Sequence, residues 1–211
     1  MSDPLQSVLT AIPEAFFHRL EERLTYCTAV AYRQAQRTPP DAPAYRMRLG
    51  NARYFERAEA FRLSAEEVGL RYRYEHVNTH AFALATSGPF HITHAKVEHW
   101  GDPIEQKEYK QALARNNPSS GEQVATQHET DPDAPLFAVI LVLYARPGTG
   151  QDETIPMRLG FGIPTCDLRG WHLLKTLDAL YLAYAEHAPK TLDQARPVLK
   201  ADPARTYQRC S

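Results

Sequence analysis

Apolar side chains in the first part of the chain recur at steps of three and four residues, which is the spacing of one face of an α-helix. The stripe runs from Leu5 to Ala31 with a break at Pro13, because a proline inside a helix removes a hydrogen bond. The pattern returns from about Asn51 to Val68 and ends before Gly69. Since the proline-rich stretch 38–43 separates the two segments, we expect an N-terminal helical hairpin.

Beyond this helix the apolar period changes to two, which is the alternation of a β-strand. One strand is predicted over Arg71–Ala85 and a second over Phe90–Glu98. The turn residues Ser87, Gly88 and Pro89 lie between them. We therefore expect a β-hairpin.

The second half of the chain contains a further strand pair and a helix. Leu136–Ala145 is apolar on both faces, as in a covered central strand, and the alternation from Ile155 to Ile163 predicts an antiparallel return. Leucines and tyrosines at helical spacing predict a C-terminal helix over Trp171–Glu186. The expected fold is one α+β domain over residues 1–190, with about four mostly antiparallel strands and this helix packed on the sheet. Residues 191–211 are expected to be a loosely attached tail.

Between the two strand pairs the chain loses its hydrophobic pattern. A short helix is predicted from Glu105 to Arg115, following Asp102-Pro103. Residues 116–135 are rich in Pro, Ser, Asp, Glu and Gln, and a loop of this length is usually functional or disordered. We expect a mobile acidic loop here.

Composition places the chain among ordinary globular proteins. Its 211 residues suffice for one sizeable domain, 43% of them are hydrophobic, and 24 basic residues nearly balance 25 acidic ones. Three widely spaced cysteines form no Cys-x-x-Cys motif, which argues against a disulfide framework or a structural zinc site. Since no apolar run could span a bilayer and the N-terminus does not resemble a leader, we expect a cytoplasmic protein without membrane contact.

Polar side chains gather in the predicted hairpin. If Ala83 and Ala85 share a face with Ala95 and Val97, the opposite face is polar and aromatic. The predicted binding surface combines this face with two adjoining arginines and comprises Arg71, Arg73, His76, Asn78, His80 and Lys96. We therefore predict a non-catalytic binding or regulatory protein whose partner is nucleic acid or another protein.

A metal-dependent phosphodiester hydrolase is the first alternative. Histidines and a carboxylate can hold a divalent metal, and the candidate ligands are His80, His94 and Glu98. However, Lys96 precedes Glu98, which reverses the Glu-x-Lys order of restriction-type nucleases, and the preceding strand has no Asp. A second alternative is a self-associating scaffold that uses Tyr181 and Tyr184 as an interface.

Arginines and tyrosines also alternate between residues 45 and 74. The set comprises Arg46, Arg48, Arg53, Arg57, Arg62, Arg71 and Arg73 with Tyr45, Tyr54, Tyr72 and Tyr74. Such a pattern suits phosphate contact combined with base stacking, but glutamates in the same stretch favour pairing along a solvated helix. No catalytic residue is predicted, because Gly-x-Ser-x-Gly is absent and the glycines of segment 147–151 lack the Gly-Lys-Ser/Thr ending of a phosphate loop.

Overall fold

The structure is a computed structural model that describes residues 3–77, 80–119 and 134–187 of the 211-residue chain, without the side chains of residues 77, 80 and 81. The helices in these ranges are α1 (Pro4–Ala11), α2 (Glu14–Ala35), α3 (Pro43–Glu67), α4 (Glu108–Ala114) and α5 (Leu177–His187). The strands are β1 (Arg71–Val77), β2 (His80–Ser87), β3 (Phe90–Val97), β4 (Leu136–Tyr144), β5 (Pro156–Pro164) and β6 (Trp171–Thr176).

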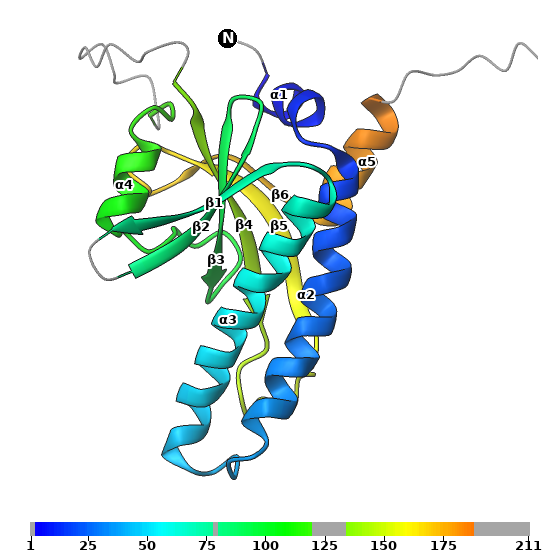
Figure 1. Ribbon diagram of the computed structural model, residues 1–211, viewed down its shortest axis with the longest axis vertical. Coiled ribbons are helices and arrows are strands. Elements are labelled where there is room, and N and C mark those ends of the chain that lie inside the picture. The colour runs from blue at the N-terminus through cyan, green and yellow to red at the C-terminus, as the bar shows by residue number, and fades with distance from the viewer. Residues whose placement is uncertain (1–2, 78–79, 120–133, 188–211) are drawn as a thin grey trace, which may run out of the picture.

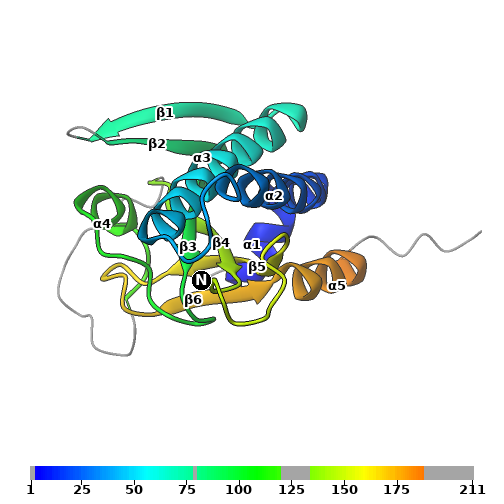
Figure 2. The same ribbon diagram turned by 90° about the horizontal axis from the view of Figure 1, so that it is seen from below.

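The strands form a single sheet in which spatial order follows chain order (Figure 1). Neighbours are antiparallel except β3 and β4, which are parallel and are separated in the chain by α4. Only three residue pairs join β2 to β3, so β1 and β2 diverge from the rest of the sheet. In Figure 2 the sheet curves around α2 and α3. The α+β class is confirmed.

Two hydrophobic cores lie on opposite faces of the sheet. The larger core contains Phe17 of α2 and Phe161 of β5, whose ring centroids are 5.6 Å apart. The smaller core lies on the face covered by α4 and contains Ala114 and Phe137. Since β4 contributes to both cores, the prediction of a strand covered on both sides is confirmed.

The predicted number of strands is wrong for two reasons. The segment Arg71–Ala85 was predicted as one strand but forms parts of two, because Val77 pairs with His80. Since only two residues separate β1 from β2, the alternation continues in phase and does not reveal the boundary. The predicted helix over Trp171–Glu186 begins with strand β6, which pairs with β5 before α5 starts at Leu177. In residues 171–176 the leucines have helical spacing over only a few residues. Hydrogen bonding to the edge of β5 therefore outweighs this weak helical preference.

The helical region also differs in detail from the prediction. Helices α2 and α3 lie side by side, and the break at Pro13 separates α1 from α2 as expected. However, α3 begins at Pro43, because a proline is well tolerated in the first turn of a helix. No helix in the described ranges is long and apolar enough to cross a membrane.

The predicted mobile loop is anchored where it begins. Asn117 is buried, and its amide bonds to the main chain of β4 and β5. Residues 116–119 therefore belong to the packed fold. Residues 120–133 and the tail 191–211 lie outside the described residues.

Candidate functional site: an arginine pocket

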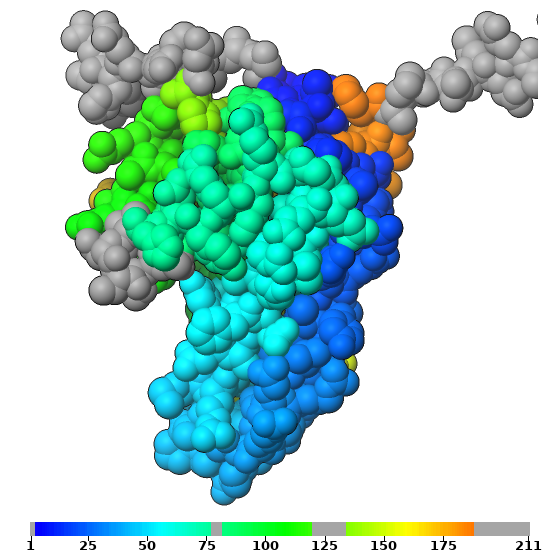
Figure 3. All heavy atoms as spheres, in the orientation of Figure 1, coloured from blue at the N-terminus to red at the C-terminus, as the bar shows by residue number. Residues whose placement is uncertain are grey.

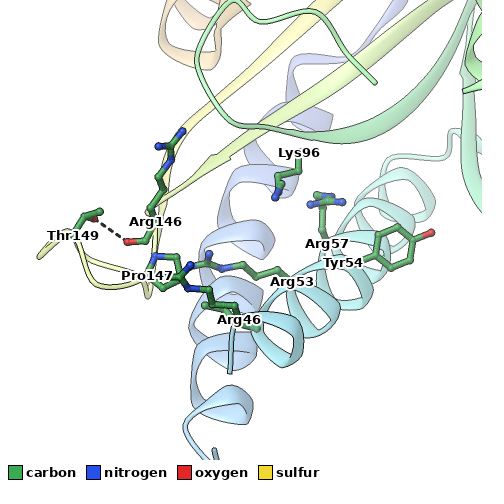
Figure 4. A pocket seen from close by; sticks show the side chains of 10 residues that line it. Arg46, Arg53, Tyr54, Arg57, Lys96, Arg146, Pro147 and Thr149 are labelled. Atoms are coloured by element: carbon green, nitrogen blue, oxygen red, sulfur yellow. Dashed lines mark hydrogen bonds between the residues drawn. The ribbon is translucent and has the colours of Figure 1, made fainter. Parts of the chain in front are cut away.

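A pocket with a volume of about 540 Å³ opens between α3, the end of β3 and the loop that connects β4 to β5 (Figure 4). Its lining comprises Arg46, Leu49, Gly50, Arg53, Tyr54, Arg57, Lys96, Arg146, Pro147 and Thr149. Half of these residues are basic, and no acidic residue lines the pocket in the part of the chain that the structure describes. We call this site the arginine pocket.

Arg53 holds the β4–β5 loop against α3. Its two terminal nitrogens donate to the main-chain oxygens of Ala145 and Glu153, at 3.2 and 3.0 Å, which are the two ends of the loop. The guanidinium also lies 4.6 Å from the ring centre of Tyr144. Because only 7% of the residue is exposed, burial lowers the pKa of Arg53. Its Nε atom has no hydrogen-bond partner among the described residues.

Arg57 lies one turn further along α3 and is 6% exposed. Its Nε donates to Nδ1 of His94 at 3.0 Å, so that ring nitrogen carries a lone pair and the imidazole is neutral. Burial and the nearby charges of Arg57 and Lys110 hold the pKa of His94 well below its ordinary value. The histidine therefore orients Arg57 without neutralising its charge.

Neither Arg53 nor Arg57 forms an ion pair with a carboxylate in the part of the chain that the structure describes. The acidic residue between them on the helix, Glu56, accepts a hydrogen bond from Gln34 instead. In contrast, the more exposed Arg62 on the same helix pairs with both Glu59 and Glu66. Burying a charge without a counter-charge is costly, so the pocket is electrostatically suited to an anion.

Lys96 and Arg146 approach the pocket from the sheet side, whereas Arg46 belongs to α3. Lys96 forms an ion pair with Glu98 at 2.6 Å, and one terminal nitrogen of Arg146 lies 3.0 Å from Nε2 of His99. Figure 4 shows Arg46 and Arg53 directed toward Pro147, with Arg57 and Lys96 at another part of the pocket. A ligand with several negative groups could therefore contact residues from three separate elements.

Lys110 of α4 adds a further buried cation next to this site. It is 5% exposed and forms no ion pair within the described ranges, and its Nζ lies 5.9 Å from the ring centre of Tyr109. Burial lowers its pKa from 10.5 to about 8; Glu105 opposes this shift, while Lys107 and Arg57 contribute to it. Its neighbour Tyr109 stacks on Phe82 with a centroid distance of 4.1 Å, which fixes this turn of α4 on the sheet.

Replacing Lys110 with Met is expected to stabilise the fold by about 1–3 kcal/mol at pH 7, because it removes a buried charge. The pKa is lowered in the folded state, so the charging penalty is fully present below pH 8 and fades as the pH rises toward 10.5. The gain should shrink over that range in urea denaturation experiments. As a control, Lys107→Met at an exposed site should change stability by less than about 0.5 kcal/mol. Equal effects of the two variants would contradict the assigned penalty.

The predicted binding surface is divided between several places. Arg71 and Arg73 line a second pocket of about 460 Å³ together with Tyr72, Thr86 and His91. Lys96 lines the arginine pocket, and His76 is exposed on β1. Asn78 lies outside the described residues, as does the side chain of His80. Lys96 is thus the one residue of the predicted surface that the structure assigns to the arginine pocket.

The predicted register of the polar face is wrong by one residue. Ala85 pairs with Ile92, so Ala83 and Ala85 join the larger core, whereas Ala95 and Val97 join the smaller core on the other face. Alternation within each strand does not determine how the strands align across a turn, because a slip of one residue exchanges the faces.

The other candidate residues make different contacts from those proposed. Nδ1 of His94 accepts from Arg57, and Glu98 pairs with Lys96. The described residues contain no group of three or more His, Cys, Asp or Glu side chains that could hold a metal ion. Tyr181 donates to Glu21, and the buried Tyr184 donates to the main chain of Ile12 at 2.6 Å, so both tyrosines bond within the chain.

The arginines of α3 were identified from the sequence, but those that line the pocket could not be told from those that form ion pairs on the surface. Arg46, Arg53 and Arg57 recur at steps of seven and four, which places them on one face of the helix, and that spacing was the available signal. No local signal distinguished Arg146, because segment 147–151 predicts a simple turn. Comparisons with protein-family models, curated proteins and solved structures each found no match.

Proposed function

We propose that this chain is a non-catalytic binding protein whose ligand carries phosphate groups and occupies the arginine pocket. The observation that carries the proposal is the pair of buried guanidiniums, Arg53 and Arg57, in a pocket lined by five basic and no acidic residues. A bound anion would provide a counter-charge at ion-pair distance, which neither guanidinium has among the described residues.

Phosphate suits this pocket better than a single carboxylate does. Guanidinium groups bind phosphate oxygens through paired, charge-assisted hydrogen bonds, and the basic residues come from three elements. A ligand with several phosphates can satisfy them together. The volume of about 540 Å³ lies within the range of small-ligand sites.

The proposed role is the binding role predicted from the sequence. The proposed binding site, however, is the pocket between α3 and the β4–β5 loop and not the polar face of the sheet. Binding by Arg71 and Arg73 stays a prediction, as do the cytoplasmic location, the protein partner, the metal-dependent hydrolase and the scaffold. The neutral His94 supports a binding role for Arg57, because the imidazole orients the guanidinium by accepting its Nε–H.

Isothermal titration calorimetry with inorganic tripolyphosphate tests this proposal. The double variant Arg46→Ala/Arg146→Ala should weaken binding by about 100-fold, because each charged contact contributes about 1.5 kcal/mol. Both side chains line the pocket, and Arg46 has no ion pair among the described residues.

The matched control is Arg48→Ala/Arg169→Ala, which removes the same charge from two exposed arginines outside the pocket lining. It should change affinity only by the small amount expected from net charge, and the difference between the two variants should persist at about 0.15 M salt. Absence of tripolyphosphate binding, or equal losses in the two double variants, would refute the proposed site.

A further inference from the structure

Two aromatic side chains of α3 lie next to the charged pocket. Tyr54 lines the pocket and is 42% exposed, and its neighbour Phe55 is 69% exposed. Their ring centroids are 5.4 Å apart in an edge-to-face arrangement. A single exposed aromatic residue is common, but here two contacting rings adjoin a pocket in which Arg46, Arg53 and Arg57 have no ion pair among the described residues.

The aromatic pair and the cations are held in one arrangement by the same helix. The guanidinium of Arg57 lies 5.8 Å from the Tyr54 ring centre, and the Tyr54 ring contacts the buried His94 ring at 6.3 Å. Figure 4 shows Tyr54 at the α3 end of the pocket, with Arg146 and Thr149 on the opposite loop. In Figure 3 the lower parts of α2 and α3 project together beyond the body of the protein.

We infer that the ligand of the arginine pocket is a single-stranded nucleic acid, whose phosphates contact the arginines while a base stacks on the Tyr54–Phe55 pair. This inference rests on the proposed function and specifies its ligand. Proteins that bind single strands combine a basic groove with aromatic rings, and stacking tolerates any base because every base has a π-face.

A double helix fits this arrangement less well. Its bases are already stacked on one another, so their faces are not available to Phe55 or Tyr54 without unstacking. Exposed rings on a helix reach the faces of unpaired bases directly. The ligand is therefore expected to bind with little dependence on base sequence, since the described residues that line the pocket include no amide or carboxylate side chain to recognise base edges.

The test compares two probes by titration against the intact protein: a fluorescein-labelled oligonucleotide of about 12 thymidines and inorganic tripolyphosphate. Phe55→Ala should weaken oligonucleotide binding about tenfold and leave tripolyphosphate binding unchanged. Tyr54→Ala should also weaken oligonucleotide binding, but only Phe55→Ala tests stacking alone, because Tyr54 lines the pocket. Circular dichroism would check that each variant is folded. Tyr26→Ala provides the matched control, because Tyr26 is 66% exposed on α2 and does not line the pocket.

Each outcome separates this inference from the proposed function. Tripolyphosphate binding by the arginines without any effect of Phe55→Ala on the oligonucleotide would overturn the inference and leave the phosphate site intact. Equal affinity for a duplex of the same length would also overturn it. Failure of both probes to bind would refute the proposed function as well, whereas a loss confined to the single strand would support both.

Discussion

Replacing Arg53 with Met is expected to lower the free energy of unfolding by about 3 kcal/mol and to weaken tripolyphosphate binding by about 100-fold. The first effect arises because two hydrogen bonds from a charged donor are lost, at Ala145 and Glu153, each contributing about 1.5–3 kcal/mol. This loss exceeds the cost of about 1–3 kcal/mol that is relieved when one buried charge is removed. The second arises because the loop that carries Arg146 is no longer held at both ends, in addition to the loss of one charge. Methionine preserves most of the volume of the aliphatic stem.

Arg53→Lys separates the two effects. Lysine keeps the charge but has no planar fork that could reach both carbonyls, so it should recover part of the affinity and little of the stability. Urea denaturation measures the stability, and amide hydrogen exchange in the β4–β5 loop should accelerate in both variants. Wild-type stability and wild-type loop protection in Arg53→Met would show that the loop is held by other contacts.

Replacing Asn117 with Ala is expected to destabilise the fold by about 3–5 kcal/mol. The Asn117 amide accepts from the N–H of Phe137 at 2.7 Å and donates to the carbonyls of Phe137 and Pro164 at 2.9 and 2.7 Å. Its removal leaves three main-chain polar groups without this partner in a buried place, and each such group costs about 1–3 kcal/mol. These bonds join the start of β4 to the end of β5.

Asn117→Asp tests whether hydrogen bonding or volume is responsible. Aspartate has nearly the same size, but its ionised carboxylate would face two carbonyl oxygens, so this variant should be at least as destabilised as Asn117→Ala at pH 7. Asn116→Ala, at the adjacent and less buried position, should cost less than about 1 kcal/mol in the same urea titration. A loss below about 1 kcal/mol in both Asn117 variants would contradict the assigned role.

The arginine pocket is also a source of instability in the unliganded protein. Arg53, Arg57 and Lys110 are all buried without an ion pair in the described ranges, although the more exposed Arg62 on α3 pairs with Glu59 and Glu66. Buried unpaired charges usually persist where function requires them. This cost supports a ligand-binding role more directly than the number of arginines in the chain does.

Local patterns in the sequence determined most helices and strands. The stripe that forms α1 and α2, the apolar run of β4 and the alternation of β3 and β5 each reflect contacts that repeat every few residues. Such periodicity indicates the element and its buried face directly. The arginine-rich stretch between residues 45 and 74 was also visible in the sequence, although the glutamates within it favoured a solvated helix.

Tertiary structure alone decided which residues meet. Strand β6 formed because an edge of β5 was available, and the face of β2 depended on a register that alternation cannot specify. Arg53 and Arg146 are far apart in the chain but line the same pocket. The Nε of Arg57 donates to the buried His94, which fixes the orientation of the guanidinium in that pocket. An arginine without an ion pair is costly only when it is buried. Burial depends on the packing of the whole molecule, so no short stretch of sequence indicates it.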